Sequence, residues 1–307
     1  MSNVQPTCTF QPALRGFLAL LLVGSINGCT PVDLGFLAPA GKVASEQRDL
    51  FLWIIGLTLI VVLPVIVLTP VLLWRYRYGQ RHAAYRPRWD FSLPMEILSW
   101  GVPVLVVIAL GVLTWQRTHQ LDPYKPLAGT SAPLEIQVIA MDWKWLFIYP
   151  QQRIASLNEL VIPIGRAVHL SLTSATVMQA LFIPRLSGQI YAMAGMRTQQ
   201  YLQADVVGEF IGRNSQFSGA GFQAQHFKTR SMSAQAFDDW AAQTRQSGEA
   251  LNCKDYLQLS QTQSLSGPLT YRDVQAGLFD EALRLAHPPG KGCIAAQVAD
   301  RQDTHHE

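Results

Sequence analysis

Two long runs without a charged residue limit most strongly what this chain can fold into. The 25 residues from 50 to 74 form a helix about 37 Å long, more than the roughly 30 Å hydrocarbon core of a bilayer. A second uncharged run, 97–116, is also long enough to span. Prolines inside both runs are tolerated by membrane helices. The runs predict transmembrane helices over 50–74 and 95–116.

The charge distribution predicts how the helices are oriented. Charged residues make up only 15% of the chain, against about 25% in an average soluble protein. The connecting segment, 75–94, has one acid, Asp90, and a group of arginines: Arg75, Arg77, Arg81, Arg86 and Arg88. The positive-inside rule makes this segment cytoplasmic and places the N-terminus and all residues after 116 outside. The arginines lie beside the membrane segments, so no nucleic-acid partner is expected.

The N-terminus resembles an export signal of a bacterial lipoprotein. Arg15 precedes a short apolar run, 16–23, and the stretch ends in Gly28 and Cys29. The run is too short to span a bilayer. We expect a signal peptide over 1–28, with the palmitate-bearing lipid on Cys29 at the start of an external segment, 29–49. The alternative is an uncleaved anchor with an ordinary cysteine.

Cleavage and acylation would leave Cys253 and Cys293 as the free thiols among the four cysteines of the chain. An even pair in an oxidising compartment favours a disulfide over two separate thiols. The closed loop of about 40 residues would contribute about 4 kcal/mol by chain entropy.

The part outside the membrane has the pattern of short strands. Leu134, Ile136 and Val138 alternate with polar residues. Further strand candidates lie near 144–149, 159–164, 168–172, 178–183, 200–206, 209–213 and 226–230. This spacing predicts an all-β sandwich or Greek-key barrel over 117–232.

After residue 232 the apolar spacing becomes helical. Ser233 is a candidate N-cap, Gly248 a candidate stop, and a second helix would place Leu278 and Ala286 on one side. We expect a helical C-terminal extension over 233–297 and a polar tail over 298–307.

Several long motifs resemble subunit II of haem-copper oxidases, in particular the branch of bacterial cytochrome bo-type ubiquinol oxidases. They are MDWKWLFIYP over 141–150, FIPRL over 182–186, QIYAMAGM over 189–196 and SGAGF over 218–222. The resemblance extends from about residue 26 to about 290. It implies a cupredoxin-like external domain.

The resemblance also implies where a binuclear copper centre lies in the branch that oxidises cytochrome c. Such a centre needs two thiolates, two imidazoles and a thioether. The five corresponding positions here carry Gln179, Asn214, Ser218, Phe222 and Gln225, and Gln216 stands where that branch has a Glu in the loop. No cysteine occurs between 30 and 252. We therefore expect no metal site, no cofactor in this chain and no cytochrome c partner.

The remaining candidates have ordinary interpretations. His226 lacks partner ligands, His169 is expected to face solvent, and the tail carries His305 and His306. Two further aromatic residues, Trp143 and Trp145, are expected either in the domain core or against a partner subunit.

The resemblance implies that this chain is a non-catalytic subunit of a proton-translocating terminal oxidase in the inner membrane. Ubiquinol would be oxidised through the complex, with haems and one copper in subunit I and with the smaller subunits III and IV as further partners. Glu96, which opens the second span, occupies the place of a proton-channel entrance; a carboxylate at a helix N-terminus is the simpler interpretation. The rival functions are a copper-bearing cytochrome c oxidase subunit and a lipoprotein scaffold or assembly factor without redox activity.

Overall fold

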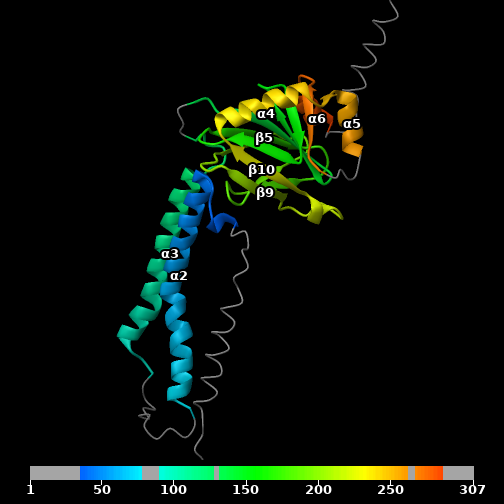
Figure 1. The fold of residues 1–307 in the computed structure, drawn as a ribbon. Helices are drawn as coiled ribbons and strands as arrows, with labels where there is room; N and C mark the ends of the chain where they lie inside the picture. Colours follow the sequence, from blue (N-terminus) through cyan, green and yellow to red (C-terminus); the bar gives the residue numbers. More distant parts are fainter. Residues whose placement is uncertain (1–34, 78–89, 128–130, 262–266, 286–307) are drawn as a thin grey trace, which may run out of the picture.

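The computed structural model describes residues 35–77, 90–127, 131–261 and 267–285. Figure 1 shows two long helices, side by side, that project from one end of a β-rich domain. They are α2 (Lys42–Arg75) and α3 (Leu93–Gln120), and each is long and apolar enough to cross a membrane. Both extend beyond the uncharged runs, because the helical backbone continues into the polar residues on the domain side.

The external domain consists of two sheets. The seven-stranded sheet has the order β11 (Glu249–Leu251), β12 (Leu269–Val274), β3 (Ile154–Leu157), β2 (Lys144–Tyr149), β1 (Leu134–Met141), β5 (Val168–Ser174) and β8 (Thr198–Leu202). The five-stranded sheet has the order β4 (Glu159–Pro163), β10 (His226–Met232), β9 (Gly208–Asn214), β6 (Gln179–Phe182) and β7 (Ile190–Ala192). The predicted all-β domain is thus a two-sheet sandwich, with β1 parallel to β5 and β10 parallel to β4.

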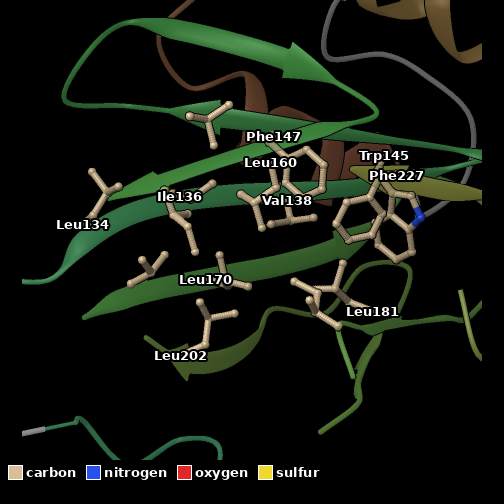
Figure 2. Close-up of a cluster of buried hydrophobic side chains, with 14 of the residues drawn as sticks. Leu134, Ile136, Val138, Trp145, Phe147, Leu160, Leu170, Leu181, Leu202 and Phe227 are labelled. Atoms are coloured by element: carbon tan, nitrogen blue, oxygen red, sulfur yellow. The ribbon is translucent and has the colours of Figure 1, made fainter. Parts of the chain in front are cut away.

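The main core lies between the two sheets. Alternate residues of β1, which are Leu134, Ile136 and Val138, are fully buried in it. Figure 2 shows them in one cluster with Leu170 of the neighbouring strand β5, and with Trp145 and Phe227 at one end of the cluster. The period-two pattern of the sequence therefore identified the inward face of the strand correctly.

The outer face of the larger sheet has a second apolar cluster that the sequence pattern did not indicate. Ile139 and Met141 of β1 are buried there against two helices, α5 (Cys253–Gln261) and α6 (Leu278–Leu285). Both faces of this end of β1 are covered. This is why the alternation stops after Val138 and the strand ends in four consecutive buried residues.

The C-terminal extension is not wholly helical. It starts with α4 (Ala234–Gln246), whose cap is the predicted Ser233: its hydroxyl accepts a hydrogen bond of 3.2 Å from the amide of Ala236. However, β12 pairs antiparallel with β3, and β11 pairs with β12. The two strands continue the sheet past an edge that would otherwise leave backbone groups unpaired. The sandwich therefore does not end at residue 232; Ala286 lies outside the described residues.

The start of α2 is tied to the domain by main-chain hydrogen bonds. The amide of Ala40 donates to the carbonyl of Arg185 at 2.7 Å, and the carbonyl of Ala40 accepts from Asp205 at 2.8 Å. A Cβ on Gly41 would lie 2.1 Å from the carbonyl oxygen of Gln203. A side chain at this residue would clash with the backbone of the domain, so this contact requires glycine.

Candidate functional site

The positions that the family resemblance assigns to copper ligands gather at one end of the five-stranded sheet. Gln179 begins β6, Asn214 ends β9 and Gln225 immediately precedes β10. These strands are neighbours, in the order β10-β9-β6. Ser218 lies in the loop that joins β9 to β10. The sheet thus brings four of the six predicted positions together.

Gln225 is the centre of the resulting hydrogen-bond network. Its Nε2 donates to the side-chain oxygen of Gln179 and, at 3.3 Å, to the carbonyl of Met141. Its Oε1 accepts from Asn214 Nδ2 at 2.9 Å and from the hydroxyl of Ser218 at 3.3 Å. Both donors and both lone pairs of this buried amide are therefore used.

The side-chain amide of Asn214 also has all its donors and acceptors paired. Its Oδ1 accepts from the backbone amides of Ala180 at 2.9 Å and Gln216 at 3.0 Å, and its Nδ2 also donates to Ser218 Oγ at 3.0 Å. Gln179 Nε2 donates to the carbonyl of Met141 at 3.1 Å. We call Gln179, Asn214, Ser218 and Gln225 the amide cluster. Its three amide side chains are 0%, 3% and 1% exposed.

The amide cluster does not fit a binuclear copper centre. Its donors are neutral amides and a hydroxyl, whereas copper in such a centre needs thiolate and imidazole. Every cluster oxygen already accepts a hydrogen bond. The other two positions do not join the cluster through their side chains: Gln216 contributes its backbone amide, and Phe222 contacts Phe217 with ring centroids 5.7 Å apart. In the described part of the chain, no three His, Cys, Asp or Glu residues form a possible metal site.

The two tryptophans of the aromatic motif have different roles. Trp145 is fully buried in the main core, so its core interpretation is correct. Trp143 is half-buried, has a left-handed backbone with φ 58°, and lies under the loop of the amide cluster. A Cβ on Gly221 would lie 2.2 Å from the ring of Trp143. The sequence showed the SGAGF motif but not its contact with this ring.

Two charged residues sit beside the site. Thr176 donates to the carboxylate of Asp142 at 2.7 Å. Burial lowers the pKa of Lys144, and the negative charge of Asp142 opposes this shift. Neither residue is part of the amide cluster.

The prediction that His169 faces solvent is wrong. Its side chain is 13% exposed, its Nδ1 lies 2.6 Å from Glu135 Oε2, and its ring stacks on Tyr201 at 4.5 Å. The neighbouring strands β1 and β8 supply these partners and cover the ring. His226 is exposed, while His305 and His306 lie outside the described residues.

Glu96 lies in the first turn of α3. Its Oε2 accepts a hydrogen bond of 3.1 Å from Trp100 Nε1, one turn further on, and the residue is exposed. Cys253 is disulfide-bonded. Its predicted partner Cys293 and the predicted lipid site Cys29 lie outside the described residues, so both assignments remain predictions.

Replacing Gln225 by Leu should destabilise the external domain by about 1–3 kcal/mol, because the partner groups would lose their hydrogen bonds inside the protein. Urea unfolding followed by circular dichroism measures this. The matched control is Gln223→Leu, two residues earlier and exposed, for which we expect a change within about 0.5 kcal/mol. Equal effects of the two substitutions would show that the cluster contributes no stability.

The fold and the site define a class: a two-sheet β-sandwich domain on two helices long and apolar enough to cross a membrane, with a buried amide cluster at one end of the smaller sheet. No family model matches the chain. It is 42% identical over 268 residues to "Cytochrome bo(3) ubiquinol oxidase subunit 2" of Pseudomonas putida, covering 87% of this chain and 84% of that protein. It is 40% identical over 270 residues to "Ubiquinol oxidase subunit 2" of Acetobacter aceti, covering 87% and 85%. The chain belongs to the ubiquinol oxidase subunit 2 family.

Among solved structures, the periplasmic domain of subunit II of cytochrome oxidase from Bradyrhizobium japonicum matches 38% of this chain and 96% of its own. The sequence identity is 22% and the TM-score 0.35. A likeness at this level supports no conclusion about function.

Proposed function

We propose that this chain is subunit II of a proton-translocating ubiquinol oxidase, a respiratory complex that oxidises ubiquinol to ubiquinone and reduces oxygen to water. The amide cluster is the observation that carries the proposal in detail. It contains no thiolate or imidazole at the place where a copper centre would accept electrons from cytochrome c. The chain then contributes no redox centre, and haems and one copper belong to subunit I.

The proposed role is structural support of subunit I, with subunits III and IV as further partners. The helix pair α2–α3 supplies the membrane contact, and the domain covers the outer side. Arg75 and Arg77 at the far end of α2 support an orientation with the connecting segment in the cytoplasm and the domain in the periplasm. Cys29, as an acylated N-terminus, would hold the chain start at the outer leaflet of the inner membrane.

Purification of the tagged full-length chain in mild detergent tests this function. We expect it to co-purify with a haem-bearing subunit, to show a haem spectrum and to catalyse ubiquinol oxidation. The chain expressed alone should show neither the haem spectrum nor the oxidation of ubiquinol. The alternative, a lipoprotein scaffold or assembly factor, predicts a chain that is absent from the active oxidase. Full ubiquinol oxidation by a complex without this chain would overturn the proposal.

Glu96 is proposed as a proton-channel entrance, and its loss should slow the oxidase. Glu96→Gln removes the titratable carboxyl but keeps an acceptor for Trp100, so we expect turnover to fall by roughly threefold to tenfold, most at high pH, where protons are scarce. Oxygen consumption and proton release by reconstituted vesicles measure this.

Two variants control for charge and for local structure. Asp90→Asn removes the same charge close to Glu96 in sequence, and Trp100→Phe removes the hydrogen bond to Glu96 but keeps the carboxylate. Both are expected to keep near-normal turnover. If Asp90→Asn slowed turnover as much as Glu96→Gln, the effect would come from surface charge and not from a proton entrance.

A further inference from the structure

A pocket of about 250 Å³ lies where the two membrane helices meet the external domain. Its walls come from the first turns of α2, the end of α3 with the segment that follows it, the loop between β6 and β7, and strand β8. Figure 1 shows that this junction is at the domain end of the helix pair. Ligand pockets for drug-sized molecules start at about 300 Å³, so this one suits a small group.

The pocket lies at the depth of lipid headgroups. Glu46, in its wall, precedes the uncharged run of α2 by four residues, and Gln120 follows that of α3 by four. Four helical residues rise about 6 Å. The headgroup layer of one leaflet is roughly 5–7 Å thick. The pocket therefore opens at the level where the headgroups of the surrounding lipids lie.

The charges in the wall are balanced. Lys42 and Lys125 face the pocket together with Glu46 and Asp122. Within the described residues neither lysine forms an ion pair. Asp122 accepts only a backbone hydrogen bond, from Tyr124 at 2.9 Å. A ligand with one positive and one negative group matches this wall; a simple anion leaves the two acids without a partner.

The start of α2 adds a place for the negative group. Lys42 and Val43, the first residues of the helix, line the pocket, and the N-cap Gly41 provides no side-chain cap. First-turn amides have no partner within the helix. That of Ala44 donates to the carbonyl of Leu186 at 3.3 Å, which leaves the amides of Lys42 and Val43 and the helix dipole to favour an anion. With the ammonium groups of Lys42 and Lys125, this end of the pocket is suited to a phosphate.

The same wall contains a buried glutamine whose side-chain oxygen accepts no hydrogen bond. Gln200 is 3% exposed, and its Nε2 donates to the carbonyl of Gly188 at 2.8 Å. Its Oε1 has no partner among the described residues. Leaving such an acceptor unpaired costs about 1–3 kcal/mol. Oε1 itself is buried, so an N–H donor of a ligand relieves this cost when the side chain of Gln200 turns toward the pocket.

We propose that this pocket binds the headgroup of phosphatidylethanolamine. The phosphate lies between Lys42, Lys125 and the start of α2, and the ammonium donates toward Glu46, Asp122 and Gln200. Phosphatidylcholine has the same charges but no N–H donor, and phosphatidylglycerol lacks the positive group. The inference goes beyond the oxidase role, because it requires only that the two helices lie in a membrane.

The test titrates lipids onto the full-length chain in mild detergent and counts bound lipids by native mass spectrometry. We expect phosphatidylethanolamine to bind about tenfold more tightly than phosphatidylcholine of the same acyl chains. Soluble glycerophosphoethanolamine should compete only at far higher concentration, since it lacks the membrane anchor. Competition at the lipid's own concentration would assign the pocket to a free solute and overturn the lipid proposal.

Paired variants separate the two halves of the headgroup. Glu46→Gln with Asp122→Asn should abolish the preference over phosphatidylcholine, whereas Lys42→Ala with Lys125→Ala should weaken both lipids about tenfold. The matched control, Lys228→Ala with Lys254→Ala, removes two exposed lysines outside the pocket. Equal affinity of the native chain for the two lipids, or lysine variants no weaker than the control, would overturn the proposal.

These outcomes do not depend on oxidase activity. A chain that binds the lipid but joins no haem protein would refute the proposed function alone. Circular dichroism of each variant shows that it is folded, and the substituted side chains lie at the surface of the junction.

Discussion

A chain with five substitutions, Gln179→His, Asn214→Cys, Ser218→Cys, Phe222→His and Gln225→Met, should acquire a binuclear copper centre. Four of these positions are already linked by side-chain hydrogen bonds, with Gln225 bonded to each of the other three. Thiolates, imidazoles and a thioether placed there supply the soft donors that copper prefers. We expect copper content to rise from background to about two ions per chain, with purple absorption and a mixed-valence spin signal.

The control carries the same substitutions with Ser in place of both new cysteines. It keeps the imidazoles and the thioether but has no thiolate to bridge two metal ions. Copper analysis, absorption and electron paramagnetic resonance measure both variants. A folded five-residue variant that bound no more copper than this control would show that the assigned positions do not correspond to a copper site. Purple absorption from the native chain would contradict the proposed function itself.

The largest loss of stability is expected for Trp145→Ala. The side chain is fully buried, and its ring lies 5.7 Å from that of Phe227, which in turn lies 5.0 Å from Phe147 (Figure 2). Truncation removes most of a large apolar surface and leaves a cavity between the two sheets. We expect a loss of about 3–5 kcal/mol in the free energy of unfolding.

Two control variants test whether the loss comes from the buried ring of Trp145. Trp145→Phe keeps most of the ring and removes an indole N–H that is buried without a partner in the described residues, so we expect a cost within about 1.5 kcal/mol. Phe217→Ala removes an aromatic ring that is 73% exposed, and we expect about 0.5 kcal/mol or less. Denaturant unfolding in detergent, followed by circular dichroism, measures all three. A small loss for Trp145→Ala would show that this side chain contributes little to the stability of the domain.

His169 shows why a polar residue at an outward position was misjudged. Strand alternation places it on the face opposite Leu170, which is correct. However, the partners that cover it, Glu135 and Tyr201, lie on neighbouring strands far away in the sequence. Alternation gives the side of a sheet on which a residue lies, but it does not indicate what covers that side.

The C-terminal part shows the same limit. The apolar spacing predicted α4 with its Ser233 cap and the buried face of α6, because capping and helical periodicity are local. The pairing of β12 with β3 was not predicted, because a short strand without a buried residue has little apolar pattern of its own and gains its structure from the open edge of the sheet.

The sequence alone determined the properties that depend on local composition. Two uncharged runs of sufficient length predict membrane helices, and the segment 30–252, which has no cysteine, supplies no thiolate in any fold. Only the tertiary structure decided which distant groups meet. The amide cluster joins residues of β6, β9 and β10, and the lipid pocket joins both membrane helices to the domain. Hydrogen bonds and charge pairs act over a few ångströms, so they are fixed by folded distances, which residue spacing along the chain does not give.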